Sequence, residues 1–355
     1  MEDKFKIDSH KLIYHVKRVA SWLDGQLISP VYMEISPGGT CNHRCIFCSV
    51  DFMGFKKRFL DTDILMKRIS ELGEYGLKSI MFAGEGEPFL HRDLPQIIVH
   101  AKNSGIDVAV TSNGVLMRPE VTDIILDSVE WIKISINAGS AQTYAAIHRT
   151  GEKDFEKVLS NIEYAVEKRQ SSACRCTLGM QILLIDENSH EVELLAQRAK
   201  NMGVDYLVVK PYTHHYRNSH EFDIRYQDFR ELEETLAQYN SDDFQVIFRA
   251  RAMKKWDDRK RYYDRCRALP FWSYIDSGGN VWGCSAHLLD ERFNYGSIYD
   301  TSFREIWEGP ERAENLKLMA SDDFDIRSCK MNCRMDEVNR YLDELKNPPD
   351  HVNFI

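Results

Sequence analysis

The sequence predicts an α/β protein in which a partial barrel of six β-α units precedes a smaller α+β domain. Short β-branched runs alternate with helical periodicity from about residue 30 to residue 210. Glycines at 76, 105 and 203 fall between a helix and the next strand, where a C-terminal cap favours positive φ. Parallel strands joined by right-handed crossovers can form such a barrel, with functional residues just after the strands.

Each expected strand is a short run rich in β-branched and aromatic residues. The helices between them show apolar residues at helical spacing, as in Leu65, Ile69 and Leu72. The six expected strands are Val31–Ser36, Ser79–Ala83, Asp107–Thr111, Trp131–Ile136, Thr177–Ile185 and Tyr206–Lys210.

The β-α rhythm stops after Lys210. One further helix, Gln227–Tyr239, is expected, followed by two short strands, Trp272–Ile275 and Val281–Gly283, around a Ser-Gly-Gly-Asn turn. The expected divisions are a helical extension (1–29), the barrel (30–210), a linker with a helix (211–262) and the small C-terminal domain (263–355).

Composition argues against several classes of function. The 46 Lys and Arg against 55 Asp and Glu give a net charge of −9, which argues against nucleic acid as a partner. The sequence has no secretory apolar region and no long apolar run, so we expect a cytoplasmic protein without membrane contact. Nine cysteines, an odd number, favour metal or redox chemistry over a disulfide framework.

Three cysteines follow the first strand. Cys41, Cys45 and Cys48 have the spacing C-x3-C-x2-C, and a loop this tight can present three thiolates to one face of a metal cluster. Three ligands leave one metal position unfilled. The alternative is a zinc knuckle with His43 as the fourth ligand, although this loop is short for wrapping a tetrahedral ion.

This motif, placed after the first strand of a β-α series, resembles the radical S-adenosylmethionine (SAM) superfamily. In that family three cysteines hold a [4Fe–4S] cluster whose fourth iron binds SAM. The resemblance implies a partial (β/α)6 TIM-type barrel with Cys41, Cys45 and Cys48 as metal ligands. Phe47 matches the family's aromatic position near the adenine.

Further positions resemble the family's SAM contacts. The segment from Gly84 to Pro88 is similar to the Gly-Gly-Glu-Pro motif, with Glu85 in place of the first glycine. Asn113 lies in a turn after the third strand, and Ser135 and Asn137 share one face of the fourth. The cofactor-binding residues that the resemblance implies are Phe47, Gly84, Glu85, Gly86, Glu87, Pro88, Asn113, Ser135 and Asn137.

A second set of cysteines lies beyond the barrel: Cys266, Cys284, Cys329 and Cys333. Four thiolates can saturate a structural zinc or an iron–sulfur cluster. The spacing C-x12-G-x4-C, which begins at Cys266, resembles the SPASM/twitch extensions of radical SAM enzymes. Only four cysteines remain here, so we expect one auxiliary [4Fe–4S] cluster in a twitch-like α+β domain, with zinc as the alternative.

The resemblance implies an enzyme that generates a 5′-deoxyadenosyl radical from SAM. The cluster arrangement is similar to that of 2-deoxy-scyllo-inosamine dehydrogenase-like members, in which the auxiliary cluster accepts an electron during a two-electron oxidation. We therefore expect an oxidoreductase that acts on a small polar metabolite, such as a sugar, aminocyclitol or nucleotide-linked sugar. An electron donor such as flavodoxin or ferredoxin is implied.

Substrate-facing candidates follow the last barrel strand: Lys210, Tyr212, His214 and Arg249. A lysine or histidine can be tuned to accept a proton near neutral pH.

Cys174 and Cys176, spaced i and i+2, would share one face of a strand and could donate a hydrogen atom if that face lines the barrel. Buried structural cysteines are the alternative.

Three other functions stay open. Peptide maturases that crosslink or oxidise side chains have a similar layout, although only 40 residues precede Cys41, which disfavours an N-terminal leader-binding domain. A radical epimerase would use Cys174 or Cys176 as hydrogen donor. The non-enzymatic alternative is a metal–sulfur scaffold or sensor.

Overall fold

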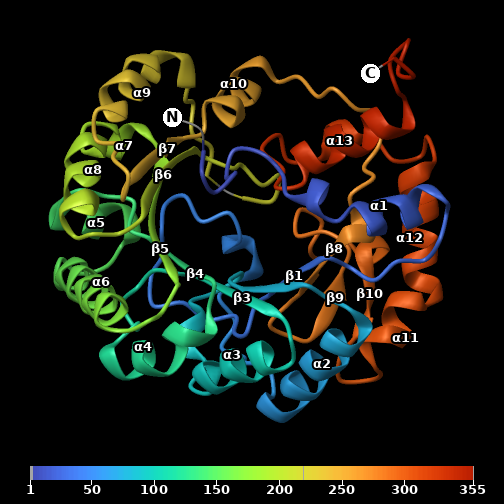
Figure 1. Ribbon diagram of the computed structural model, residues 1–355, viewed down its shortest axis with the longest axis horizontal. Coiled ribbons are helices and arrows are strands. Elements are labelled where there is room, and N and C mark those ends of the chain that lie inside the picture. Colours follow the sequence, from blue (N-terminus) through green and yellow to red (C-terminus); the bar gives the residue numbers. More distant parts are fainter. Residues whose placement is uncertain (1–2, 219, 355) are drawn as a thin grey trace.

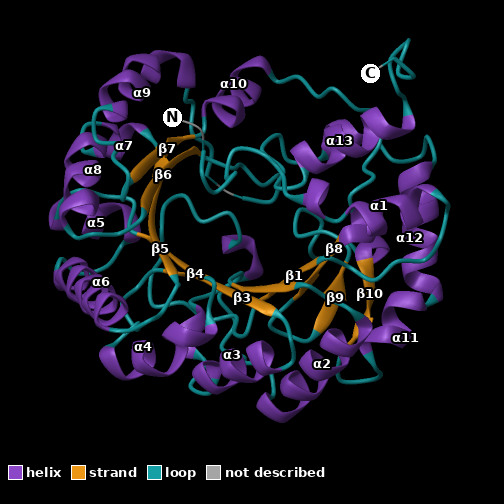
Figure 2. Ribbon diagram, in the orientation of Figure 1, coloured by secondary structure: helices purple, strands orange, loops and turns teal. Residues whose placement is uncertain are grey.

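A single curved sheet of ten strands surrounds the centre of the molecule, and helices cover its outer face (Figure 2). The computed structural model describes residues 3–218 and 220–354 (Figure 1). The strand order is β10-β9-β8-β1-β2-β3-β4-β5-β6-β7. From β8 to β7 every neighbouring pair is parallel, whereas β9 pairs antiparallel with both β8 and β10. β7 forms one edge of the sheet, so the barrel is open between β7 and β8.

The strands are short, as is usual for an α/β barrel. Their bounds are β1 Tyr32–Ile35, β2 Ser79–Phe82, β3 Asp107–Ser112, β4 Trp131–Ser135, β5 Thr177–Leu184, β6 Tyr206–Pro211, β7 Gln245–Phe248, β8 Trp272–Ile275, β9 Asn280–Trp282 and β10 Asn294–Ser297.

The helices alternate with the strands up to β8. They are α1 Val16–Leu23, α2 Thr62–Tyr75, α3 Leu94–Asn103, α4 Pro119–Ile125, α5 Ala141–His148, α6 Lys153–Ser171, α7 Asp186–Ser189, α8 Val192–Asn201, α9 Arg230–Ala237, α10 Ala250–Asp258, α11 Phe303–Glu308, α12 Pro310–Ala320 and α13 Asp336–Lys346. Gly76 ends α2 with a φ of 97°, a backbone angle that favours glycine.

The partial barrel is confirmed, and the six expected strands correspond to β1–β6. Two features differ from the expectation. β7 lies inside the segment expected to be a linker, where its four residues are too few for a clear sequence signal. β8 pairs in parallel with β1, so the C-terminal hairpin continues the barrel sheet. Such pairing between distant segments has no local signature.

The two faces of the sheet have different partners. Outward residues such as Ile132 and Ile134 belong to the large core between strands and helices. Inward residues form a small separate cluster, in which Met81 and Ala109 pack against Trp131. The alternation follows from the two-residue period of a strand. Odd-numbered residues of β4 therefore face the barrel interior.

The N-terminal segment lies beside the open edge of the barrel. Phe5 and Ile7 pack against inward residues of β6 and β7. Leu12 then packs with Leu342 of α13 and with Phe271, which directly precedes β8. The segment thus connects the two strands between which the barrel is open. Among the described residues, the helices are too short or too polar to cross a membrane.

Candidate cluster and cofactor sites

The three-cysteine loop follows β1 and is held by elements far away in the sequence. The backbone N–H of Arg44 donates to the carbonyl of His148 at 3.0 Å, at the end of α5. The side-chain amide of Asn218 donates to the carbonyl of Cys48 at 3.1 Å. The N–H of Glu87 donates to the carbonyl of Thr40 at 3.0 Å. These bonds fix the loop at the carboxyl ends of the strands.

The thiols of this loop are strongly desolvated. Burial is the largest cause that raises the pKa of Cys41 to about 12, and it raises the pKa of Cys45 and Cys48 as well. Three neighbouring thiolates therefore need nearby positive charge, which bound metal ions supply. Three desolvated thiols on one short loop fit the face of an iron–sulfur cluster.

His43 does not complete a zinc knuckle. Its Nε2 lies 3.5 Å from a carboxylate oxygen of Asp154. Among the described residues, the one group of three potential ligand atoms within 4.8 Å of one another is His43, Cys45 and His148. This group includes only one of the three motif cysteines, so the expected zinc alternative does not assemble.

The loop after β2 contains Glu87, whose side chain is buried. Its carboxylate accepts hydrogen bonds from Ser112 Oγ at 2.7 Å, from the N–H of Asn113 at 2.8 Å and from the N–H of Phe89 at 3.2 Å. A carboxylate has about four acceptor positions. One position therefore remains for an ammonium group such as that of SAM.

Gly84, Gly86 and Pro88 shape this loop. A Cβ on Gly86 would lie 2.0 Å from the carbonyl oxygen of Thr40, and a Cβ on Gly84 would lie 2.5 Å from the hydroxyl oxygen of Tyr274. Both positions therefore require glycine. Pro88 begins the single 3-10 turn that follows.

Glu85 was expected to contact the cofactor, but the structure gives its side chain a different partner. Its carboxylate accepts from the N–H of Ser277 at 2.9 Å and from Ser277 Oγ at 2.7 Å. Arg58 lies 3.4 Å from the same carboxylate. Ser277 belongs to the turn between β8 and β9, so Glu85 ties the loop after β2 to the C-terminal hairpin.

Asn137 also differs from the expectation. It has a φ of 56°, and its Oδ1 accepts from the N–H of Leu183 at 2.8 Å while its Nδ2 donates to the carbonyl of Ser135. Its amide thus joins the ends of β4 and β5. Ser135 Oγ accepts from Gln181 Nε2 at 3.2 Å. Gln181 was not foreseen, and its buried Oε1 has no partner within the part of the chain described.

Two other expected cofactor residues lie beside the cysteine loop. Asn113 donates through Nδ2 to Asn42 Oδ1 at 2.7 Å. Phe47 is buried in the main core, and its ring packs edgewise on His148 with centroids 5.6 Å apart. Phe47 therefore supports the loop from beneath.

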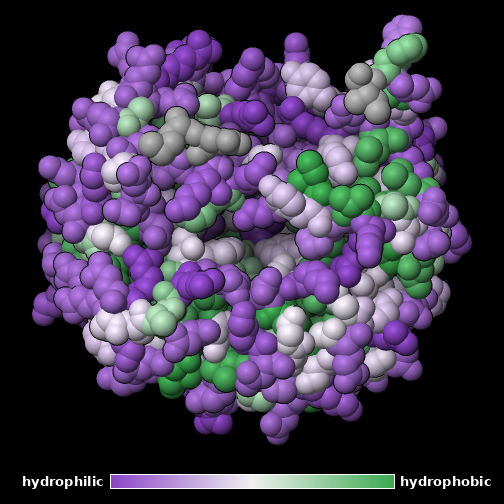
Figure 3. All heavy atoms as spheres, in the orientation of Figure 1, coloured by the Kyte–Doolittle hydropathy of each residue, from purple (hydrophilic) through white to green (hydrophobic). Residues whose placement is uncertain are grey.

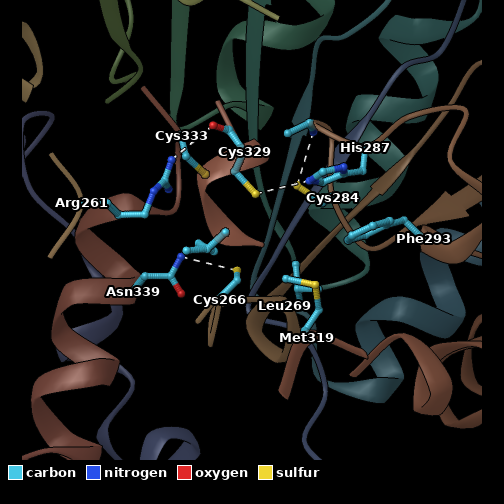
Figure 4. A pocket seen from close by; sticks show the side chains of 12 residues that line it. Arg261, Cys266, Leu269, Cys284, His287, Phe293, Met319, Cys329, Cys333 and Asn339 are labelled. Carbon is cyan, nitrogen blue, oxygen red and sulfur yellow. Dashed lines mark hydrogen bonds between the residues drawn. The ribbon is translucent and has the colours of Figure 1, made fainter. Parts of the chain in front are cut away.

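The four C-terminal cysteines line one small cavity of about 20 Å³ (Figure 4). Hydrogen-bond donors approach several of the sulfurs. Asn339 Nδ2 donates to Cys266 Sγ at 3.5 Å, and the N–H of Ala286 donates to Cys284 Sγ at 3.3 Å. His287 Nε2 lies 3.4 Å from Cys329 Sγ. Such surroundings suit thiolates bound to a cluster.

The spread of these sulfurs argues against zinc. Tetrahedral zinc with Zn–S bonds of about 2.3 Å holds its sulfurs about 3.8 Å apart. Within residues 3–218 and 220–354, no three of these four thiols lie within 4.8 Å of one another. Sulfurs spread more widely than this around one cavity suit the larger iron–sulfur cluster.

The expected catalytic residues occupy different surroundings. Lys210 lies on the inward face of β6, and desolvation followed by repulsion from Lys133 holds its pKa well below the usual range. Tyr212 is buried and donates through its hydroxyl to the carbonyl of His220 at 3.1 Å. His214 is partly exposed, 3.7 Å from Glu221.

Arg249 follows β7 and pairs with Asp8 of the N-terminal segment at 3.1 Å. The positive charge of Arg249 is therefore paired with a carboxylate, whereas Lys210 has no such partner among the described residues.

Cys174 and Cys176 do not face the barrel interior. β5 begins at Thr177, so both lie at its amino end, whereas the cysteine loop follows the carboxyl end of β1. Cys176 is buried in the core between sheet and helices, and Cys174 donates to the carbonyl of Leu126 at 3.1 Å. This placement argues against the hydrogen-donor role and favours the structural alternative, because the pair precedes β5 at the amino end of the barrel.

Lys133 was missed by sequence reasoning. It lies on the inward face of β4, two residues before Ser135, so the alternation of Trp131–Ser135 could have identified it. Its ammonium is 5.4 Å from the centre of the Trp131 ring. Desolvation is the largest cause that lowers the pKa of Lys133 to about 7, and repulsion from Arg334 and Arg249 adds to it.

Two family profiles match the chain. Residues 35–199 match the radical SAM superfamily, and residues 266–334 match the SPASM iron–sulfur cluster-binding domain. A GTP 3′,8-cyclase of Chlorobaculum tepidum is 27% identical over 186 residues, which is 52% of this chain and 55% of that protein. Another, from Tolumonas auensis, is 30% identical over 45% of this chain and 47% of that protein. The matches thus span about half the length of these relatives.

Solved structures share the fold over most of the chain. Streptococcus suis SuiB bound to S-adenosylmethionine superposes with a TM-score of 0.65 at 16% identity, covering 84% of this chain and 70% of that one. The protein anSMEcpe with bound AdoMet gives a TM-score of 0.60 at 16% identity, covering 82% and 84%.

Proposed function

The chain belongs to the radical SAM superfamily and carries a C-terminal SPASM domain, and on that premise we propose an oxidoreductase that oxidises a small polar metabolite by two electrons. The metabolite classes are a sugar, an aminocyclitol or a nucleotide-linked sugar. Its cofactors are SAM, the SAM-binding [4Fe–4S] cluster and auxiliary iron–sulfur chemistry. Cys41, Cys45 and Cys48 would hold the first cluster, and Cys266, Cys284, Cys329 and Cys333 the second.

When bound, these groups supply a hydrogen-abstracting 5′-deoxyadenosyl radical and an acceptor for one electron. The oxidation of an alcohol to a ketone then balances if the hydrogen atom goes to the deoxyadenosyl carbon, the electron to the auxiliary cluster and the remaining proton to a base. The electron that cleaves SAM comes from a protein donor of the flavodoxin or ferredoxin class.

One contact carries the proposal. Arg334 directly follows Cys333, and its guanidinium reaches Glu34 on the inward face of β1 at 2.5 Å. The four-cysteine cavity therefore adjoins the barrel interior, because the residue next to Cys333 already contacts Glu34 inside the barrel. An electron acceptor held there is close to a substrate in the barrel, which is the layout that a two-electron oxidation requires.

Lys210 is the proton acceptor in this proposal. Burial, followed by repulsion from Lys133, holds its pKa well below that of an ordinary lysine, which favours the neutral amine that a proton acceptor requires. Tyr212 and His214 are less suited, because the Tyr212 hydroxyl is committed to a backbone carbonyl and His214 lies beside Glu221.

The test uses anaerobic protein with both clusters, SAM, a reductant and candidate metabolites. We expect 5′-deoxyadenosine together with a product lighter by two hydrogen atoms. The matched control is Cys329→Ala, which should form 5′-deoxyadenosine without the oxidised product. A product of unchanged mass that contains solvent deuterium would refute oxidation, and the placement of Cys174 already disfavours such an epimerase.

A peptide is the second candidate substrate. SuiB, which shares this fold, has been solved bound to its precursor peptide SuiA, and anSMEcpe has been solved with a peptide as well. The curated relatives instead carry a name that specifies GTP, a small molecule. Consumption of a peptide, with no metabolite oxidised, would favour the maturase alternative.

A further inference from the structure

The barrel interior is rich in cationic side chains, although the protein as a whole is acidic. A space-filling view shows a hollow at the centre of the molecule with hydrophilic residues around it (Figure 3). Several long cationic side chains lie near one another inside the sheet, with two carboxylates among them. The cations are Lys133 of β4, Lys210 of β6, Arg249 after β7 and Arg334 before α13, and the carboxylates are Glu34 of β1 and Asp8.

The carboxylates neutralise the arginines but not the lysines. Asp8 pairs with Arg249 at 3.1 Å, and Glu34 pairs with Arg334 at 2.5 Å. For Lys133 and Lys210, no carboxylate oxygen of the described chain lies within 4.0 Å. Both lysines are partly accessible to solvent although protein surrounds them. Neither lysine therefore has an ion-pair partner in the described chain, although Glu34 lies close enough to favour the charged form of both.

The two lysines respond differently to these surroundings. The pKa of Lys210 is held well below the usual range, whereas that of Lys133 is about 7, with desolvation the largest cause for both. Arg334 and Arg249 lower both values and Glu34 raises them. Because the pKa of Lys133 is about 7, an approaching negative group favours its charged form near neutral pH.

We propose that Lys133 and Arg334 together bind an oxyanion group, a phosphate or a carboxylate, of the substrate inside the barrel. Arg334 uses Nη1 for Glu34 and the hydroxyl of Tyr32. Its Nε and Nη2 donate to no group among the described residues, and the side chain is 45% exposed. A planar guanidinium with two free donors suits an oxyanion. The inference rests on the proposed function for one point, namely that the substrate occupies the barrel.

Binding can be measured without turnover. We would titrate the protein carrying both clusters and SAM with inorganic phosphate and with acetate, at low ionic strength, by calorimetry. We expect one site per chain for at least one probe. Preference for phosphate assigns a phosphorylated substrate, and preference for acetate assigns a carboxylate.

The variants separate binding from folding. Lys133→Met should weaken binding about 10- to 100-fold, because a charged hydrogen bond is lost, and Lys133→Arg should restore most of it. Lys317→Met is the matched control, since Lys317 is exposed on α12 and pairs only with Glu314. Removing an uncompensated charge should leave the unfolding temperature unchanged or higher, so lost binding cannot be ascribed to misfolding.

The direction of two further changes in anion binding can be predicted. Glu34→Gln releases Arg334 and removes a negative charge, so it should strengthen anion binding. Binding should also be accompanied by proton uptake and should weaken as pH rises above about 7, because an anion favours the charged form of Lys133. Lys133→Met should abolish the uptake.

The inference is overturned if neither probe binds, if Lys133→Met binds as tightly as the parent protein, or if Glu34→Gln weakens binding. These outcomes can be distinguished from failure of the proposed function, which would show as 5′-deoxyadenosine without an oxidised product. A protein that oxidises its substrate and has no lysine-dependent anion site would refute the inference alone.

Discussion

Replacing Glu85 by glutamine should loosen the turn between β8 and β9 without disturbing the rest of the sheet. The Glu85 carboxylate is 2% exposed and accepts two hydrogen bonds from Ser277. A glutamine amide has one acceptor oxygen, so at least one of these bonds is lost. A hydrogen bond to a charged group contributes about 1.5–3 kcal/mol. The nearby Arg58 adds less, because its side chain is 32% exposed and 3.4 Å away.

Hydrogen exchange of the intact protein, read out on peptides by mass spectrometry, measures this effect. A loss of about 1.5–3 kcal/mol in local opening free energy speeds exchange of the Ser277 amide by roughly 10- to 150-fold. Peptides from β3 should be unchanged. Ser277→Ala is a companion variant: it keeps the amide donor but loses the hydroxyl, which donates to Glu85 and accepts from Arg58 Nε at 2.7 Å, so exchange of the same peptide should also become faster.

One result would refute this reasoning. If Glu85→Gln weakened SAM binding while exchange near Ser277 stayed within about twofold of the parent protein, Glu85 would act on the cofactor directly. The hydrogen bonds described here would then be of little consequence.

Three further variants test the sites. Gly86→Ala places a Cβ 2.0 Å from the carbonyl oxygen of Thr40, so the cysteine loop must shift and SAM affinity should fall about tenfold or more; parent-like affinity in a dialysis assay would contradict this. Cys329→Ala should lower the iron content from about eight to about four per chain, and an unchanged iron assay would exclude Cys329 as a ligand. Lys210→Met should slow product formation about 100-fold or more while 5′-deoxyadenosine still forms, and an unaltered oxidation rate would eliminate Lys210 as the base.

The sequence was most informative where function depends on a short local pattern. Cys41, Cys45 and Cys48 lie within one loop, so their spacing alone indicated a common metal site. The four later cysteines lie far apart in the sequence, so their assignment to a second metal site depended on the family resemblance. The structure brings them to one cavity.

Sequence reasoning was least informative where two distant segments meet. Glu85 stood out as a departure from the family motif, but its partner Ser277 is reached only through the pairing of β8 with β1. The alternation of β4 could have identified Lys133 as an inward residue, whereas its lowered pKa depends on desolvation and then on Arg334 and Arg249 from other parts of the chain. Cys174 and Cys176 were considered as hydrogen donors only on the condition that they face the barrel interior, and because β5 begins at Thr177, as expected, both lie before it at the amino end of the barrel.

The direct pairing of β8 with β1 constrains the distance between the two proposed metal sites. Tyr32 is aligned with Trp272 and Ile35 with Ile275, so Cys41, which follows β1, and Cys266, which precedes β8, flank opposite ends of adjacent, hydrogen-bonded strands. The hydrogen bonds between β1 and β8 set this distance, so the length of the chain that connects the two strands in sequence can vary. A chimaera that exchanges the C-terminal region with that of a relative should therefore keep the residues through which β1 and β8 pair. The exact point of exchange near residue 262 matters less.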